Sequence, residues 1–145
     1  MTEVMFHLNV ADRLAYACRL LRKACAVEAR VVVSGPSSTL TRLDSLLWTF
    51  DPAAFIPHLR VTAPSEVPSH LQHTPIWLIE HAEQAPHRDV LLNLGDDLVP
   101  GFESFAKVIE IVPVEEAPKA AARQRWKHYA TRGYAMQRHE ARAVP

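Results

Sequence analysis

The chain has 145 residues, of which 48% are hydrophobic and 22% are charged. This length and composition predict one globular domain spanning residues 1–145 with a core of its own. No apolar run approaches the about 20 residues that span a bilayer. The N-terminus also lacks the basic and apolar regions of a signal peptide, so we expect a cytoplasmic protein without membrane contact.

The charges are balanced overall but unevenly distributed along the chain. Residues 117–145 contain seven Lys and Arg residues and one acid, a net charge of +6, whereas residues 1–116 contain nine basic and fifteen acidic residues, a net charge of −6. Such an asymmetry indicates that the C-terminal part meets an anionic partner. The alternative is an ordinary solvated helix face.

The first helix illustrates how the elements are predicted. The apolar residues Leu14, Cys18, Leu21 and Cys25 recur at spacings of three and four, which is typical of a helix with one buried face, and Asp12 is a candidate N-cap. The predicted elements, in chain order, are a strand at 4–10, a helix at 12–27, a strand at 30–34, a helix at 39–48, strands at 75–79 and 89–94, a helical turn at 102–105, a strand at 107–112 and a helix at 115–133.

Prolines and polar residues interrupt this alternation in two places. Four prolines between residues 50 and 68 predict that 50–67 is mostly loop, and residues 134–145 are expected to be an irregular tail. Because strands and helices alternate and the strands are almost continuously apolar, the sequence predicts a mostly parallel α/β sheet with helices on both faces.

The loops that follow the first two strands lack the features of a nucleotide site. The first contains no glycine, and the second, Gly35-Pro36-Ser37-Ser38-Thr39, contains one glycine and no following Lys-Ser or Lys-Thr pair. Neither can wrap backbone N–H groups around a phosphate in the manner of the known loops. We therefore expect no nucleotide or other cofactor.

No catalytic or metal-binding motif is recognisable either. The eight histidines are scattered, and His70 and His73 lie in a proline-rich loop without a third ligand. Cys18 and Cys25 are expected to be buried apolar residues, with a metal pair as the alternative. The sequence therefore argues against an enzyme and assigns no catalytic and no metal residue.

The last predicted helix has a cationic face beside a tryptophan. Lys119, Arg123 and Trp126 lie at positions i, i+4 and i+7, and Lys127 flanks them. Such a face can bind an acidic peptide that ends in an apolar residue. It can equally bind single-stranded nucleic acid, with Trp126 stacked on a base. A third possibility is that Trp126 faces the core.

A second candidate surface is aromatic. Trp48, Phe50 and Phe55 lie within eight residues at the end of a predicted helix and in the loop after it. Exposed aromatic clusters often anchor a protein partner. The alternative is that all three are buried.

Five segments in this order resemble the chi subunits of bacterial DNA polymerase III, over nearly the whole chain. They are Leu43-Asp44-x-x-Leu47-Trp48 with Phe55-Ile56-Pro57-His58; Asp89-Val90-Leu91-Leu92-Asn93-Leu94; Phe105 with Val108-Ile109-Glu110-Ile111-Val112-Pro113; Ala122-Arg123-Gln124-Arg125-Trp126-Lys127-x-Tyr129; and Gly133-Tyr134.

The resemblance implies a single Rossmann-like domain without catalytic activity that acts as an adaptor in the replisome. It implies that Trp48 and Phe55 bind the psi subunit of the clamp loader, and in some members a DNA-repair helicase. It also implies that the acidic C-terminal tail of single-stranded DNA-binding protein is bound by Val112, Lys119, Arg123, Trp126 and Lys127, so that contact with DNA is indirect.

The chain departs from the family in two places. Position 126 is a tyrosine in other members, and the tryptophan keeps the apolar wall but lacks the hydroxyl. Arg138 and Arg142 stand where more polar residues are expected. Their extra charge could strengthen tail binding or serve another purpose.

Overall fold

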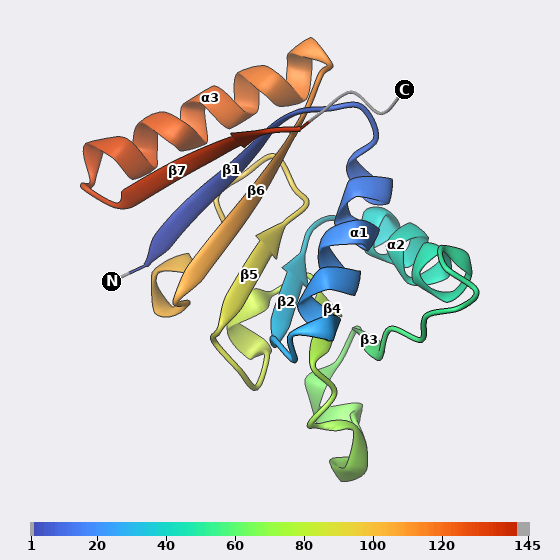
Figure 1. The fold of residues 1–145 in the computed structure, drawn as a ribbon. Helices are drawn as coiled ribbons and strands as arrows, with labels where there is room; N and C mark the ends of the chain where they lie inside the picture. Colours follow the sequence, from blue (N-terminus) through green and yellow to red (C-terminus); the bar gives the residue numbers. More distant parts are fainter. Residues whose placement is uncertain (1, 142–145) are drawn as a thin grey trace.

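The computed structural model describes residues 2–141. It consists of strands, three helices and four short 3-10 turns (Figure 1). The helices and strands, in chain order, are β1 Glu3–Val10, α1 Arg13–Ala26, β2 Val31–Ser34, α2 Ser37–Thr49, β3 His58–Val61, β4 Ile76–Ile79, β5 Val90–Asn93, β6 Lys107–Pro113, α3 Glu116–Thr131 and β7 Ala135–Glu140. The turns are Pro64–Glu66, Ser69–Leu71, Ala82–Gln84 and Phe102–Ser104.

The strands form one seven-stranded sheet in the order β3-β4-β2-β5-β6-β1-β7, and every pair is parallel. The central strands β2 and β4 are buried throughout, which is expected where both faces of a parallel sheet are covered. The predicted α/β fold is therefore confirmed.

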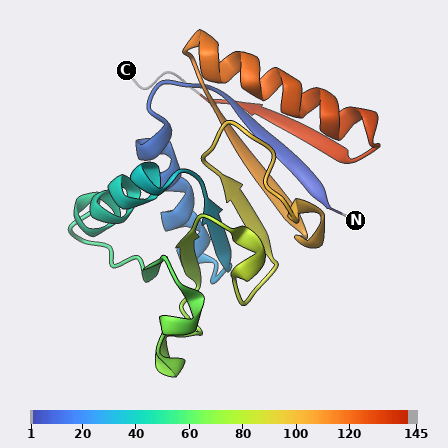
Figure 2. The same cartoon turned by 180° about the vertical axis from the view of Figure 1, so that it is seen from behind.

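Alternate side chains of the strands divide the core into two clusters. Val31 and Val33 of β2 pack with α1 and α2 on one face, whereas Val32 packs in the cluster that includes Ala122 and Tyr129 of α3. This separation follows from the two-residue period of a strand. Both views show α1 and α2 side by side, away from α3, and the segment with the turns at 64–66 and 69–71 protruding from the body (Figures 1 and 2).

Local residue chemistry explains where α1 begins and where α3 begins and ends. The Asp12 side chain caps α1 by accepting a hydrogen bond from the Ala15 amide at 3.1 Å. Pro118 lies in the first turn of α3, where its missing N–H costs no hydrogen bond. Gly133 follows the end of α3 with a φ of 79°, a left-handed conformation that favours glycine.

The prediction that residues 50–67 are mostly loop missed one strand, and the prediction of an irregular tail from residue 134 was wrong. Within the predicted loop, His58–Val61 forms β3, an edge strand that fits between Pro57 and Pro64 because it needs only one partner, β4. Within the predicted tail, Ala135–Glu140 forms β7, which pairs with β1 at the opposite edge. Arg142, also part of that tail, lies outside the described residues.

Over residues 2–141 of the fold, the two cysteines and the candidate metal ligands form no joint site. Cys18 is buried and Cys25 half-buried, and both are free. Burial, and to a lesser extent the Asp12 carboxylate, raises the pKa of the Cys18 thiol to about 11. Within these residues no three His, Cys, Asp or Glu side chains gather as a metal site, and none of the helices has the length and apolarity to cross a membrane.

Candidate binding surfaces

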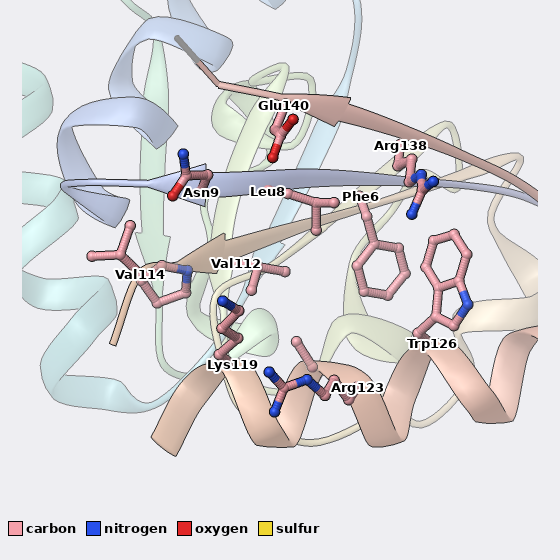
Figure 3. A pocket seen from close by; sticks show the side chains of 12 residues that line it. Phe6, Leu8, Asn9, Val112, Val114, Lys119, Arg123, Trp126, Arg138 and Glu140 are labelled. Atoms are coloured by element: carbon pink, nitrogen blue, oxygen red, sulfur yellow. The ribbon is translucent and has the colours of Figure 1, made fainter. Parts of the chain in front are cut away.

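A groove of about 450 Å³ runs between α3 and the strands β6, β1 and β7 (Figure 3). Its side chains come from four segments that are far apart in the sequence, and the sheet order brings three of them together as adjacent strands. The lining residues are Phe6, Leu8 and Asn9 of β1, Val112 and Pro113 of β6 with Val114 after it, Lys119, Ala122, Arg123 and Trp126 of α3, and Arg138 and Glu140 of β7.

The floor of the groove is apolar. Phe6 and Val112 are almost fully buried beneath it, and Trp126 is half-buried. The Trp126 ring meets the Phe6 ring edge to face, with centroids 5.0 Å apart. One side of the Trp126 ring packs against the core, and the ring also lines the groove. Trp126 therefore faces both the core and the surface.

The helix side of the groove is cationic. Lys119 and Arg123 are exposed and lie one turn apart on α3. The Arg123 guanidinium is 3.1 Å from the Glu116 carboxylate, with 60% and 77% of the two side chains exposed. Ion pairs this exposed contribute roughly 0–1 kcal/mol, so an incoming carboxylate can displace Glu116.

The structure brings together four of the five residues expected for this site. Val112, Lys119, Arg123 and Trp126 share the groove, whereas Lys127 is exposed on α3 and does not line it. Helix geometry explains the difference, because Lys127 follows Trp126 by one residue and therefore points about 100° away from it.

Sequence reasoning did not place β1 or β7 in the groove, although it noted that the charge of Arg138 could strengthen tail binding. Phe6 and Leu8 belong to a strand recognised only as core, and Arg138 and Glu140 to a segment expected to be irregular. The pattern that could have revealed Phe6 and Leu8 is the two-residue period of a strand, because Val4, Phe6 and Leu8 lie on one face of β1. No local signal places β1 between β6 and β7.

A buried polar network holds α3 on the sheet. The carboxylate of Glu110, at the centre of β6, accepts hydrogen bonds from Arg125 Nε at 3.1 Å, from the Tyr129 hydroxyl at 2.8 Å and from Asn93 Nδ2 at 3.2 Å. Arg125 also donates to the Asp96 carbonyl at 2.6 Å. The network connects α3 with β6, with β5 and with the loop after β5.

Burial of the network is the main reason why the pKa values of Glu110 and Tyr129 are raised. Desolvation raises the pKa of Glu110, while the Arg125 guanidinium and the hydrogen bonds act in the opposite direction. Burial and then the charge of Glu110 raise the pKa of the Tyr129 phenol far above its usual range. Tyr129 therefore remains a hydrogen-bond donor, and the network is a fixed structural element.

The aromatic patch, defined by Trp48 and Phe55, is exposed. Their side chains are 58% and 70% exposed, and their ring centroids lie 6.0 Å apart. Phe50, the third aromatic, is half-buried with the Arg22 guanidinium 5.0 Å above its ring. Two of the three aromatics therefore remain available to a partner.

Residues of the Leu43–Trp48 and Phe55–His58 segments support this patch from beneath. The His58 side chain is fully buried, and its ring centroid lies 4.7 Å from that of Trp48. Its Nδ1 is 2.7 Å from the Ile56 carbonyl, and its Nε2 is 3.0 Å from Asp44 Oδ1. Asp44 and His58 thus hold the end of α2 against β3, which keeps both exposed rings in place.

The structure also has a second pocket of about 420 Å³ at the carboxyl ends of β1, β2, β5 and β6. It is lined by Ala11, Asp12, Arg13, Leu14, Thr39, Arg42, Asp96, Pro113, Glu115 and Pro118. Arg13 donates to the Leu94 carbonyl at 3.0 Å and pairs with Asp96 at 3.4 Å. A side chain at Gly35 would come within 3.2 Å of Leu94 Cβ, so the loops after β2 and β5 pack closely together.

The fold and these surfaces define a small α/β domain with a cationic groove and an exposed aromatic patch. Residues 1–137 match the family model described as DNA polymerase III chi subunit, HolC. A relative from Pseudomonas aeruginosa, named DNA polymerase III subunit chi, is 34% identical over 145 aligned positions that cover 96% of each chain. Relatives of the same name from Haemophilus influenzae and Escherichia coli are each 29% identical, and cover 81% and 64% of this chain and 80% and 60% of their own. The chain belongs to the DNA polymerase III chi subunit family.

Proposed function

We propose that this chain is a non-catalytic adaptor of the replisome. Its groove binds the acidic C-terminal tail of single-stranded DNA-binding protein, and its aromatic patch binds the psi subunit of the clamp loader. The observation that supports the first contact best is the composition of the groove: an apolar floor of Phe6, Val112 and Trp126 bordered by the cations of α3. An acidic peptide that ends in Pro-Phe has the complementary chemistry.

The binding mechanism follows from this arrangement. Arg123 and Lys119 pair with carboxylates of the tail, and its terminal phenylalanine packs against Trp126, Val112 and Phe6. Each charge-assisted contact at such a half-exposed site contributes about 1–2 kcal/mol, and burial of the phenylalanine about 1.5–3 kcal/mol.

These contributions predict a weak contact. After the cost of association, the affinity is roughly micromolar and falls as salt is added. Such an affinity is sufficient because several tails on one oligomeric partner raise the effective concentration at the groove.

The aromatic patch serves the second contact. Trp48 and Phe55 offer two adjacent exposed rings, and large aromatic anchors of this kind dominate many interfaces. The psi subunit is the proposed partner here, and a DNA-repair helicase is the candidate for the same surface where psi is replaced.

Calorimetric titration with a synthetic acidic peptide ending in Pro-Phe tests the groove. We expect Arg123→Ala to weaken binding about tenfold, which corresponds to the loss of about 1.4 kcal/mol. Arg132→Ala is the matched control, because Arg132 is exposed at the end of α3 but does not line the groove.

Two results would contradict the assignment. Equal affinities of wild type and Arg123→Ala would remove the groove as the tail site. Tight binding of a single-stranded oligonucleotide alone, with a steep dependence on salt, would favour direct nucleic-acid binding.

A further inference from the structure

The groove has a second wall, formed by β7. In the parallel pair of β1 and β7, Phe6 lies beside Arg138 and Leu8 beside Glu140. Neighbouring residues of a sheet point to the same face, so Arg138 and Glu140 face α3 as Phe6 and Leu8 do. His139 points to the other face, where its ring lies 5.6 Å from that of His7.

This wall carries one charge of each sign at different positions along the groove. Arg138 lies at the end with Phe6 and Trp126 and points toward their rings, whereas Glu140 lies near Leu8 and Asn9 (Figure 3). Lys119 and Arg123 stand on the α3 side of the groove, and the Arg123 guanidinium is directed along the helix toward Lys119 and Glu116 (Figure 3). The groove therefore holds three cations against one carboxylate, and the cations stand on both sides of the apolar floor.

Arg138 is available for a ligand as far as the structure describes the chain. Its side chain is exposed, and within residues 2–141 it takes part in no salt bridge. Arg123, by contrast, must leave Glu116 before it can pair with a ligand. A carboxylate that enters between α3 and β7 therefore meets an unpaired guanidinium on the strand side.

We propose that Arg138 and Glu140 determine which chain ends this groove accepts and in which direction they lie, an inference that rests on the proposed function of the groove. Arg138 and Arg123 hold the terminal carboxylate from opposite walls while the terminal apolar side chain packs on Phe6 and Trp126. Glu140 repels carboxylates at the opposite end of its wall, so the peptide enters past Lys119 with its terminus at the Trp126 end.

A groove with cations on two opposed walls discriminates between peptide ligands better than a single cationic face does. Two cations on one helix attract any anion along their length, whereas guanidiniums on two walls favour a carboxylate between them and fix its position. The like charge of Glu140 adds an unfavourable contact for the reversed orientation. The occupant fitted by this arrangement is an acidic peptide whose last residue is apolar and carries a free carboxylate.

The test is calorimetric titration of Arg138→Gln, Arg138→Lys and Glu140→Gln with the same acidic peptide ending in Pro-Phe. We expect Arg138→Gln to weaken binding about tenfold and Arg138→Lys much less. Glu140→Gln should strengthen it about two- to fivefold. Arg132→Gln, an exposed arginine outside the groove, is the control and should stay within about twofold.

A peptide with an amidated C-terminus separates the terminal carboxylate from the acidic side chains. Against this peptide the effect of Arg138→Gln should largely disappear, which a double-mutant cycle measures directly. If Arg138→Gln binds both peptides like wild type while Arg123→Ala still weakens binding, the role of β7 is refuted and the proposed function stands. If Arg123→Ala is also without effect, both are refuted.

Discussion

At the scale of single residues, Arg123 and Arg125 of α3 show how position decides the role of a charge. Each guanidinium lies 3.1 Å from a carboxylate of this chain. The Arg123–Glu116 pair is 60% and 77% exposed, whereas the Arg125–Glu110 pair is 3% and 0% exposed. The first pair can open for a ligand, and the second is part of the core.

This difference predicts unequal effects on stability. Arg125→Met leaves the Glu110 carboxylate buried without its countercharge, and the free energy of unfolding should fall by about 3–5 kcal/mol. Arg123→Met removes an exposed pair and should change it by roughly 0–1 kcal/mol. Urea unfolding of both variants measures the contrast.

A double variant tests whether the unpaired Glu110 charge causes the stability loss in Arg125→Met. Glu110→Gln removes the negative charge but keeps an oxygen that can accept from Tyr129 and Asn93, so combining it with Arg125→Met should restore part of the lost stability. Equal unfolding free energies for Arg125→Met and Arg123→Met would show that the buried pair does not hold α3 in place.

The sequence alone could separate these two arginines only in part. A separation of two residues places them about 200° apart on a helix, so they cannot share one face. The partner of Arg125, however, is Glu110 on β6, and only the packing of α3 on the sheet brings the two together. The count of seven basic residues in the C-terminal segment therefore overstates the charge offered to a ligand.

At the scale of elements, strands predicted from apolar runs were found, and the two edge strands were missed. β2 and β4 are recognisable because both of their faces are buried. Five of the six residues of β7 are exposed, and its strand character comes from pairing with β1, a partner more than a hundred residues away. Local propensity contains no information on such a pairing.

The same limit applied to the candidate site. The helix side of the groove was predictable from the spacing of Lys119, Arg123 and Trp126 on one face. On the strand side only Val112 was expected, from the family resemblance, because the rest depends on the order of β6, β1 and β7 in the sheet.

The contact between β1 and β7 also predicts that the stability of the folded protein depends on pH. Burial, and then the positive charges of His139, Lys107 and Lys23, lowers the pKa of His7 from 6.5 to about 4. On acidification the unfolded chain takes up this proton near pH 6.5, and the folded protein only near pH 4. The stability contributed by neutral His7 is therefore intact above pH 6.5 and is lost between pH 6.5 and pH 4.

Thermal unfolding midpoints measured across this pH range test the assignment. In His7→Gln the side chain no longer titrates but can still bond to the Tyr16 hydroxyl, the partner of His7 Nδ1, so the midpoint should fall less steeply toward pH 4. His70→Gln, a change at an exposed histidine, should retain the wild-type slope. A His7→Gln slope equal to that of wild type would exclude His7 as the cause.

At the scale of the whole molecule, the two binding surfaces lie at opposite edges of the sheet. The aromatic patch belongs to the end of α2 and the segment leading into β3, the first strand in the sheet order, whereas the groove is completed by β7, the last. Three strands, β4, β2 and β5, lie between β3 and the strands that line the groove, and the core on both of their faces is buried. A close-packed body of this kind has no second arrangement in the structure through which one site could influence the other.

The chain should therefore bind its two proposed partners independently. Trp48→Ala should weaken the complex with purified psi subunit by at least about tenfold while the affinity for the acidic tail peptide stays within about twofold, and Arg123→Ala should do the reverse. Because Trp48 is 58% exposed, its truncation should change the unfolding free energy by less than about 1 kcal/mol. Val27→Ala, at a 76% exposed apolar residue outside the patch, is the matched control.

Titration of the peptide in the presence of saturating psi tests directly whether the two sites are coupled. An unchanged dissociation constant means zero coupling free energy between the sites, and a shift of more than about threefold would show that the sheet transmits binding from one edge to the other.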